Sequence, residues 1–400
     1  MATKETVITS ERGAMTEEIT ETIRAVLDRL DVPPTLHQPL FTGNERAYVM
    51  ECIDTGWVSS VGSYVDRFET MIAEFTGAAL AVAVVNGTAA LQVALTICGV
   101  KPEDEVLVPS LTFVATANAV RYCGAVPHFV DVENRTLGLD ADKLNTYLGE
   151  IAYIEDGVTK NRRTGATIRA MVPMHTFGHP VDLDALAEVG GRWRLDVVED
   201  AAESLGSYYK GRHTGTFGRV GVLSFNGNKI VTTGGGGALL FKDSEDGKLA
   251  KHLTTTARVP HRWEYFHDMV GYNFRMPNLN AALGCAQLEQ VDSFVERKRE
   301  LAKEYLAAFA NMPGVKIYRE PEFARSNYWL NALVFDDDHA NQRDAVLTAT
   351  NDGGVMTRPI WTPMHKLPMY AECPRMDMSV TESLERRVIN IPSSVSRRLK

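Results

Sequence analysis

The stretch SFNGNKIVTTGGGG, residues 224–237, places a single lysine, Lys229, between a short apolar segment and four consecutive glycines. Glycine lets a backbone approach a ligand closely. A lysine beside such a run can hold a phosphate as a point charge or, once deprotonated, attack a carbonyl. The stretch is not a Walker P-loop, because that motif needs GxxxxGK[ST] and here Ile230 follows the lysine. It therefore favours carbonyl chemistry at Lys229 over nucleotide hydrolysis.

Two segments upstream of Lys229 carry polar groups at expected strand ends. NGTAALQVAL, residues 86–95, follows an apolar run and opens a helix, whose first N–H groups and dipole form an anion site. A turn that needs Gly87 for its geometry explains the same residues equally well. Asp200 ends RLDVVED, where an acid either meets a ligand or caps the next helix. A helix-start phosphate site, a strand-end acid and Lys229 are together the parts required to hold pyridoxal phosphate.

Composition indicates an ordinary globular protein and argues against several classes of function. The chain has 400 residues, of which 44% are hydrophobic and 23% charged, and its net charge of -9 argues against a general nucleic-acid binder. Five scattered cysteines without a CxxC pair favour reduced thiols in the cytoplasm. Neither a secretory signal nor a membrane span is predicted. His175 and His179 are four residues apart, but the intervening glycine and following proline argue against a metal site.

Seven apolar or β-branched runs alternate with helical patterns, which is typical of a largely parallel sheet covered on both faces. The runs are residues 80–85, 104–109, 125–132, 168–174, 194–200, 221–225 and 237–241. Helical spacing predicts an N-terminal helix over 16–30, as an appendage, and one long helix from Pro277 to Phe309. We expect an α/β protein with an extension at 1–37, a large domain at 38–285 and a smaller α+β domain at 286–400.

Eight segments, in consistent order from about residue 38 to 335, resemble the DegT/StrS-type (DegT/DnrJ/EryC/StrS) sugar-nucleotide aminotransferases. The resemblance implies the fold type I architecture and the cofactor pyridoxal 5'-phosphate. The segments are FTGNERAYVMECIDTGWVSSVGSYVDRFE, NGTAALQVAL, PSLTFVATANAV, VDVENRTLGLD, PMHTFGHPVDLDAL, EDAAESLGSYYKG, SFNGNKIVTTGGGG and GYNFRMPNLNAALG.

The resemblance also implies roles for individual residues. Lys229 matches the lysine that binds the cofactor as an imine, and Asp200 matches the acid that pairs with its pyridine nitrogen. Phe113 matches the aromatic side chain that stacks on the ring, with Ala202 on the opposite face. The phosphate positions are Gly87, Thr88, Ala89 and Ser224, and Asn273 matches a residue that reaches the partner subunit's phosphate. Glu203 stands near the phenolic oxygen, where Gln or His is common, and the expected substrate contacts are His175, Tyr272 and Met276.

By resemblance, the chain is expected to be a homodimer with shared active sites that transfers an amino group from glutamate to C4 of a nucleotide-linked 4-keto-6-deoxy sugar. The N-terminal extension and three motifs are most similar to the branch that uses UDP-4-keto-6-deoxy-N-acetylglucosamine in legionaminic acid-type synthesis. The alternative substrate is GDP-4-keto-6-deoxymannose, as in perosamine synthesis. A cofactor-dependent sugar dehydratase would carry histidine in place of Lys229, and a non-catalytic protein on this fold would tolerate the loss of Lys229 or Asp200.

Overall fold

A computed structural model describes residues 4–398, with side chains described from residue 13 onward. Its centre is a nine-stranded sheet in which the seven strands of the main path are ordered β1-β11-β10-β7-β6-β2-β3. All seven predicted runs are strands of this sheet, so this part of the prediction is confirmed. The strands are β1 (Leu80–Val84), β2 (Glu105–Pro109), β3 (Val126–Val130), β4 (Ala152–Glu155), β5 (Val158–Asn161), β6 (Thr167–Met171), β7 (Asp196–Asp200), β10 (Val220–Ser224) and β11 (Gly237–Phe241).

Strand direction brings the candidate site residues together at the carboxyl ends of neighbouring strands. Strands β10, β7, β6, β2 and β3 pair in parallel, whereas β11 is antiparallel to both of its neighbours, β1 and β10. Strand β1 therefore runs in the same direction as β10 and β7. Asp200 and Ser224 end β7 and β10, and α4 starts just after β1. The hairpin of β4 and β5, which extends the sheet beside β6, was not predicted.

Both faces of the central sheet are covered, as the apolar runs predict. Along β1, Ala81 and Ala83 pack in one apolar cluster, and Val82 and Val84 pack in another on the opposite face. Successive strand residues point to opposite faces, so this alternation requires an apolar layer on each side. The helices of this part of the chain are α2 (Glu45–Thr55), α3 (Ser63–Thr76), α4 (Gly87–Ile97), α5 (Val114–Tyr122), α6 (Ala141–Ile151), α7 (Leu183–Arg192) and α8 (Ser244–Thr254).

The long helix predicted from Pro277 to Phe309 is instead two helices, α9 (Asn278–Leu288) and α10 (Val291–Ala308). The break falls at Glu289 and Gln290, whose side chains bind other segments of the chain. Glu289 accepts from Arg67 at 2.8 Å, and Gln290 donates to Glu45 at 2.8 Å. These tertiary contacts fix the break, and the apolar spacing that continues across it could not reveal them.

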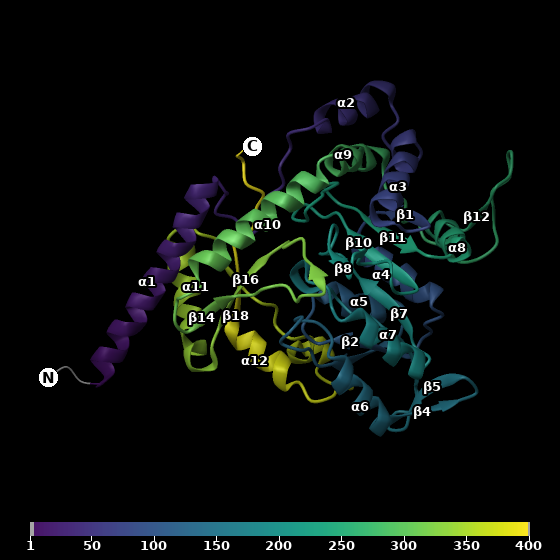
Figure 1. Cartoon of the computed structure of the whole chain (residues 1–400). Helices are drawn as coiled ribbons and strands as arrows, with labels where there is room; N and C mark the ends of the chain where they lie inside the picture. The colour runs from purple at the N-terminus through teal and green to yellow at the C-terminus, as the bar shows by residue number, and fades with distance from the viewer. Residues whose placement is uncertain (1–3, 399–400) are drawn as a thin grey trace.

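A second, antiparallel sheet has the order β14-β16-β18-β17 and lies in the C-terminal part of the chain. Helix α1 (Lys4–Leu30) packs against this part in Figure 1, so it is not the appendage that the sequence suggested. Ile19, Ile23 and Val26 are 0% exposed and share one apolar cluster with residues of α10, β14, β16 and β18. The elements are β14 (Val315–Ile317), β16 (Asn331–Phe335), α11 (Arg343–Asp352), β17 (Arg358–Pro359), α12 (Ser379–Arg387) and β18 (Val388–Ile391).

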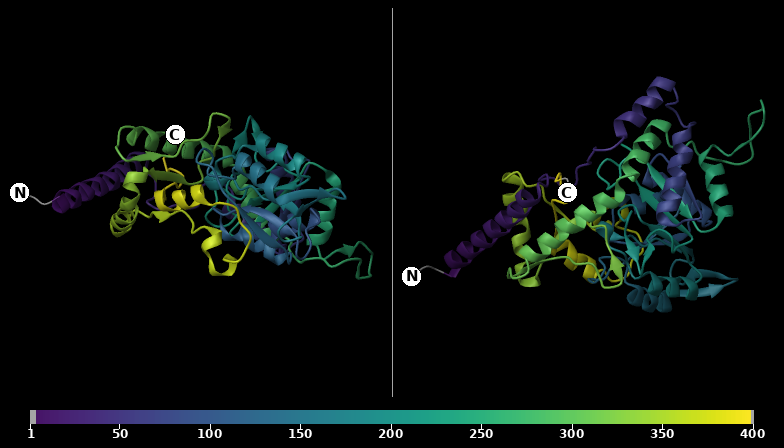
Figure 2. Two further views of the ribbon diagram at one scale, coloured as in Figure 1. Left: turned by 90° about the horizontal axis from the view of Figure 1, so that it is seen from below. Right: turned by 45° about the horizontal axis from the view of Figure 1, so that its top comes forward.

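Two segments extend away from the body at opposite ends in both views of Figure 2: the N-terminal part of α1, and the hairpin of β12 (Arg258–Val259) and β13 (Phe266–His267). The hairpin region exposes large apolar side chains, including Trp263, Tyr265 and Val270. No helix among residues 4–398 is both long enough and apolar enough to cross a membrane. The predicted domain boundaries at 37 and 285 stay predictions.

Candidate active site

The loop that carries Lys229 begins where β10 ends and closes on itself before β11. The Phe225 N–H donates to the Gly236 carbonyl at 2.9 Å, and the Thr233 N–H donates to the Phe225 carbonyl at 3.0 Å. The glycine run allows this closure. A Cβ on Gly236 would lie 2.2 Å from Thr233 Oγ1, and a Cβ on Gly237 would lie 2.7 Å from the Gly87 nitrogen. The glycines therefore let the lysine loop pack directly against the start of α4.

The start of α4 has the form of an anion site. The side chain of Asn86 caps the helix by accepting the Ala89 N–H at 2.8 Å, and the Asn86 carbonyl accepts from Ala90. The N–H groups of Gly87 and Thr88 are thus the donors of the first turn that a ligand can take. A Cβ on Gly87 would lie 3.0 Å from Ser224 Cβ, so the glycine lets the Ser224 hydroxyl approach the same point.

Asp200 is a buried carboxylate without an ion-pair partner among the described residues. Its Oδ2 accepts from the Thr116 hydroxyl at 2.7 Å, and its Oδ1 accepts from the Ala202 N–H at 3.2 Å. The residue is 3% exposed. Burial raises its pKa, because the charged form loses hydration, and the two hydrogen bonds offset only part of that effect. A cation placed beside this carboxylate would be strongly stabilised.

Lys229 faces a buried glutamate and an aromatic ring. Its Nζ lies 3.3 Å from Glu203 Oε1 and 3.9 Å from the centre of the Trp329 ring. The other carboxylate oxygen of Glu203 accepts from the Phe177 N–H at 2.9 Å. Burial raises the pKa of Glu203 to about 7, although the Lys229 charge opposes the shift. The buried Glu203 carboxyl group therefore lies within hydrogen-bonding distance of the Lys229 amine.

The turn that orients Glu203 is held in a strained conformation. Phe177 has a φ of 56°, a left-handed value that a bulky residue rarely adopts. A Cβ on the following Gly178 would lie 1.9 Å from Asn327 Oδ1. Asn327 in turn donates to the Glu203 carbonyl at 2.9 Å and accepts from the Trp329 N–H at 2.8 Å. One network thus positions both groups that contact the lysine.

These groups share a cavity of about 640 Å³ between the central sheet and the C-terminal sheet. Phe113, the residue before α5, is 51% exposed although it is a large aromatic side chain, and Ala202 also lines the cavity. The lining residues are Leu36, Asn86, Gly87, Thr88, Leu91, Phe113, Ala115, Met174, Asp200, Ala202, Glu203, Ser224, Asn226, Asn228, Lys229, Trp329, Leu330, Arg358, Pro359, Ile360, Trp361, Thr362 and Asn390.

The cavity fits pyridoxal phosphate on each point that the structure can test. The Gly87 and Gly237 positions leave the backbone of the helix start accessible, as a phosphate requires. No described cation hydrogen-bonds to the buried Asp200, and a protonated pyridine nitrogen would supply that positive partner. Phe113 offers an uncovered aromatic face for the ring. The residues present therefore match the chemistry of this cofactor.

Five of the residues named from the sequence do not line the cavity. Ala89 has given its N–H to Asn86, and Asn273 is exposed and accepts from Arg275 at 3.1 Å. His175, Tyr272 and Met276 were expected to contact substrate, and their surroundings give that role no support.

Packing accounts for the positions of these three residues. His175 is 0% exposed, with Nε2 3.0 Å from Glu199 Oε2 and Nδ1 accepting from the Val181 N–H at 3.3 Å. The Tyr272 ring stacks on Phe274, with ring centres 4.8 Å apart. Met276 is 0% exposed, and its Cε would contact a Cβ on Gly236 at 2.6 Å. The described residues contain no cluster of His, Cys, Asp or Glu that could hold a metal ion.

Some residues that line the cavity or support its side chains were not identified from the sequence. Thr116 donates a hydrogen bond to Asp200. It lies in the segment PSLTFVATANAV, three residues after Phe113, and this nearness to a predicted ring contact was the only sequence signal for it. Trp329, Arg358 and Trp361 come from the C-terminal part of the chain, more than 90 residues after Lys229. Nothing in the local sequence around these three residues indicates that folding brings them to the lysine.

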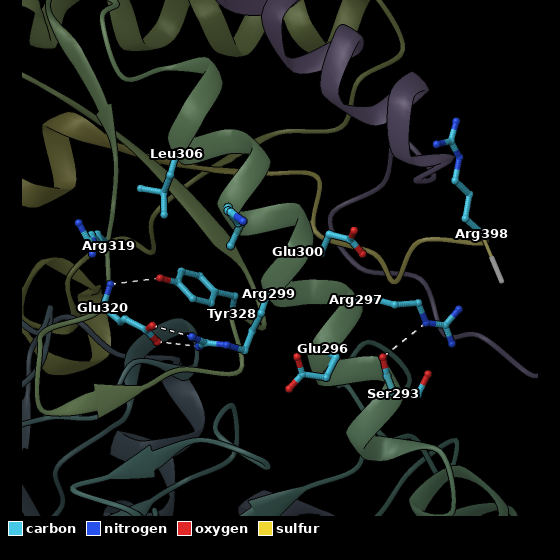
Figure 3. Close-up of a pocket in the computed structure, with 12 residues that line it drawn as sticks. Ser293, Glu296, Arg297, Arg299, Glu300, Leu306, Arg319, Glu320, Tyr328 and Arg398 are labelled. Carbon is cyan, nitrogen blue, oxygen red and sulfur yellow. Dashed lines mark hydrogen bonds and ion pairs between the residues drawn. The ribbon is translucent and has the colours of Figure 1, made fainter. Parts of the chain in front are cut away.

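A second hollow, of about 820 Å³, lies over α10 (Figure 3). It is lined mostly by charged side chains, unlike the cavity around Lys229. Arg299 donates to both carboxylate oxygens of Glu320 at 2.8 Å, and the Glu320 N–H donates to the Tyr328 hydroxyl at 3.3 Å. Arg319 and Arg398 lie on its rim. Because Arg299 is already paired with the Glu320 carboxylate, we locate the chemistry in the smaller cavity around Lys229.

Comparison with known proteins decides the family. Residues 40–398 match the profile of the DegT/DnrJ/EryC1/StrS aminotransferase family. The chain belongs to this family. It is 38% identical over 358 residues to the GDP-perosamine synthase of Escherichia coli O157:H7, covering 90% of this chain and 92% of that protein. It is 35% identical to the GDP-perosamine synthase of Vibrio cholerae, covering 90% and 93%.

Solved structures of the family have the same fold. The aminotransferase TlmJ of Streptoalloteichus hindustanus superposes with a TM-score of 0.80 at 31% identity, over 90% of this chain and 93% of that one. The sugar aminotransferase CalS13 of Micromonospora echinospora gives 0.79 at 27% identity, over 90% and 94%. The predicted fold type I architecture, the cofactor pyridoxal phosphate and the sugar aminotransferase activity are therefore confirmed. The perosamine relatives favour the GDP-linked alternative over the UDP-linked branch.

Proposed function

We propose that this DegT/DnrJ/EryC1/StrS aminotransferase transfers an amino group from glutamate to the C4 keto group of GDP-4-keto-6-deoxymannose. The observation that carries the choice of substrate is the similarity to relatives named GDP-perosamine synthase, which extends over nine-tenths of the chain. The cavity around Lys229 supports the reaction type. It combines an amine, a buried proton acceptor and a phosphate-binding helix start.

Several residues of the cavity would have distinct tasks in the proposed reaction. Pyridoxal phosphate, when bound, supplies an electron sink that would stabilise the negative charge left when a proton is removed from the carbon bonded to the amine nitrogen. The N–H groups of Gly87 and Thr88 and the Ser224 hydroxyl would hold its phosphate. Asp200 would keep the pyridine nitrogen protonated, and Phe113 would cover one face of the ring.

Lys229 would be the acid–base group of the reaction. With its Nζ neutral, Lys229 can accept the proton from the α carbon of the donor, and it can later deliver a proton at C4 of the sugar. Glu203, 3.3 Å from Nζ, is placed to hold a proton between these steps. Trp329 lies over the amine at 3.9 Å and excludes water from that side.

UDP-4-keto-6-deoxy-N-acetylglucosamine is the second candidate substrate. It is favoured by the similarity of GWVSSVGSYV, SFNGNKIVTTGGGG and GYNFRMPNLNAALG to the branch that makes legionaminic acid-type sugars. A competition assay with UDP-, GDP- and dTDP-linked 4-keto-6-deoxy sugars, read by mass spectrometry of the aminated products, separates the candidates. We expect the highest kcat/KM with the GDP-linked sugar. A higher value with the UDP-linked acetamido sugar would replace the proposal by the second candidate.

We also propose that the protein is a homodimer in which each active site uses Asn273 of the partner subunit. Asn273 is exposed and does not line the cavity of its own chain. The exposed apolar residues of the β12–β13 region offer surface for such an association.

Mixing Lys229→Ala and Asn273→Ala proteins under subunit exchange tests the shared site. In a mixed dimer one site carries both changes and the other carries neither, so activity should rise above that of either parent. The prediction fails if mass spectrometry shows exchange while activity remains at the parental level.

A further inference from the structure

The segment that follows α1 contributes to the cavity although it precedes the part of the chain that matches the family profile. That match begins at residue 40, whereas Leu36 lines the cavity around Lys229. Residues 31–39, here called the strap, follow directly after α1, which ends at Leu30. The tasks assigned to the cavity above leave Leu36 without one.

Backbone hydrogen bonds to the C-terminal part of the chain hold the strap in place. The Ser393 N–H donates to the Leu36 carbonyl at 2.8 Å, and the Met356 N–H donates to the Pro34 carbonyl at 2.8 Å. Helix α1 packs on the C-terminal sheet through its buried face and so fixes the point from which the strap starts. The position of Leu36 is therefore set by the fold on both sides of the residue.

A buried lysine ties the strap to the ring that covers the active-site amine. Lys298 is 0% exposed, and its Nζ donates to the Trp329 carbonyl at 3.0 Å and also to the Ser393 carbonyl. Ser393 in turn holds Leu36, and the centre of the Trp329 ring lies 3.9 Å from Lys229 Nζ. One anchor thus fixes Leu36 and Trp329 relative to each other.

The strap brings no positive charge to the cavity. Its sequence, DVPPTLHQP, contains neither lysine nor arginine. Burial, together with the positive charges of Lys298 and Lys229, holds the pKa of His37 well below its usual range, so the imidazole is neutral. The strap is therefore suited to an uncharged part of a substrate and not to the diphosphate of a nucleotide sugar.

Leu36 completes an apolar corner of the cavity, which consists of Leu36, Leu330 and Ile360. Leu36 packs against the apolar cluster that contains the other two residues, and all three line the cavity. Trp361, another lining residue, packs against the same cluster. An apolar surface of this kind favours a hydrocarbon group of a ligand over a hydroxyl group, which would lose its hydrogen bonds to water there.

We propose that the apolar corner binds the C6 methyl group of the keto sugar, with Leu36 as a specificity-determining residue; the inference rests on the proposed aminotransferase reaction and extends it to the sugar site. C6 is bonded to C5, which is bonded to the C4 carbonyl carbon, so the methyl group lies close to the reacting amine. It is the only hydrocarbon substituent of the sugar ring. Both candidate substrates are 6-deoxy sugars, so the inference holds for either nucleotide.

Binding of unreactive sugar nucleotides tests the proposal. GDP-linked 6-deoxymannose and mannose lack a keto group and differ only in the hydroxyl at C6, and calorimetric titration of the holoenzyme gives the Kd of each. The UDP-linked pair of 6-deoxy-N-acetylglucosamine and N-acetylglucosamine replaces them if the competition assay favours the UDP-linked keto sugar.

The variants are Leu36→Ala and Leu36→Met, and the matched control is Leu40→Ala. Leu40 follows directly after the strap and packs on the same apolar cluster as Leu36, but it does not line the cavity. The control therefore removes the same side-chain atoms from the same cluster without changing the proposed contact with the sugar.

We expect the wild type to bind the 6-deoxy sugar roughly tenfold more tightly than its 6-hydroxy counterpart. Leu36→Ala should reduce this preference to about threefold or less, mainly by weakening the 6-deoxy ligand, because the methyl group loses its apolar contact. Leu36→Met should keep most of the preference, and Leu40→Ala should leave it unchanged. The half reaction with the amino donor should stay within about twofold of the wild type in all three variants.

Three results would overturn the proposal. Equal weakening of both ligands in Leu36→Ala would place Leu36 against a part of the sugar that the two share. Unchanged affinity and preference would leave the strap outside the sugar site. Matching losses in Leu36→Ala and Leu40→Ala, with a lower Tm in both, would make the role of Leu36 structural. Failure of the aminotransferase proposal is recognised separately, because no keto sugar would then yield an aminated product in the competition assay.

Discussion

The cavity around Lys229 and the hollow over α10 both contain charged side chains but differ in how those charges are arranged. In the hollow, Arg299 is matched to Glu320 by two contacts of 2.8 Å (Figure 3). In the cavity, Asp200 is 3% exposed and has no ion pair within the described chain, and Glu203 faces Lys229 across 3.3 Å. The hollow is the larger of the two, at about 820 Å³ against 640 Å³.

The difference shows that volume is a poor indicator of a site in this protein. Buried charges without full partners cost free energy, so a fold retains them where a ligand or a reaction uses them. A matched pair such as Arg299 and Glu320 already satisfies both charges and needs no ligand to explain it.

Replacing one lysine in each region, Lys229 in the cavity and Lys303 in the hollow, should give the clearest difference in activity. Lys229→Ala removes the acid–base group of the cavity, and we expect transamination to fall by roughly a thousandfold or more. Lys303→Ala, in the α10 hollow, should leave kcat within about twofold of the wild type. Steady-state assays of both variants provide the test. Comparable losses in the two variants would remove the distinction between the regions.

The charge of Asp200 should matter more than its size. Asp200→Asn keeps the shape of the side chain and its contact with Thr116 but removes the negative charge that a protonated pyridine nitrogen would meet. We expect kcat to fall roughly a hundredfold, which corresponds to a few kcal/mol of transition-state electrostatics. The measurement is kcat with glutamate at saturating keto sugar. Near-normal turnover would place the partner of the pyridine nitrogen elsewhere.

Glu203 should make the stability of the cofactor-free protein depend on pH. Its pKa is raised from 4.5 to about 7 by burial, so the folded state binds more protons than the unfolded state between these values. The free energy of unfolding therefore falls as pH rises through this window, by up to about 3 kcal/mol for this group. In Glu203→Gln this contribution disappears, so the variant should gain stability relative to the wild type between pH 5 and pH 8.

Denaturant midpoints of the cofactor-free proteins across that pH range measure the effect. Glu320→Gln serves as the matched control, because it changes a carboxylate in the other hollow. Parallel pH profiles for the wild type and Glu203→Gln would show that the carboxyl group is not held in the environment described here.

The smallest effect is expected at the surface. Glu296 lines the α10 hollow and pairs with Arg325, and the two side chains are 67% and 43% exposed. Glu296→Gln should lower the free energy of unfolding by less than about 1 kcal/mol and leave kcat unchanged. Chemical denaturation and a steady-state assay check both values. A large loss of activity would show that the hollow takes part in the reaction.

The central sheet could be predicted because its signal is local. Runs such as residues 80–85 and 237–241 are continuous and apolar, as strands buried on both faces must be. The break between α9 and α10 could not be predicted, since it depends on contacts of Glu289 and Gln290 with residues more than 200 positions earlier. The packing of α1 on the C-terminal sheet is likewise a tertiary fact.

The residues of the candidate site likewise include some that local motifs predicted and some that they could not. Lys229, Asp200 and Gly87 stand in motifs whose spacing has a chemical reason, and the structure brings all three to one cavity. His175 and Met276 stand in similar motifs but lie buried outside the lining of the cavity, because side-chain direction is not encoded in the motif, and their expected substrate contacts stay predictions. Trp329 and Arg358 reach the cavity only through the C-terminal sheet, so local sequence could not place them there.

The most direct test of this account is the covalent site of the cofactor. The holoenzyme is reduced with borohydride, digested, and mapped by mass spectrometry for the pyridoxyl adduct. The account predicts that the adduct lies on Lys229, in the peptide that contains SFNGNKIVTTGGGG, and that it is absent from Lys229→Ala. An adduct on any other lysine, or an unchanged adduct in Lys229→Ala, would contradict the assignment of the active site to this cavity.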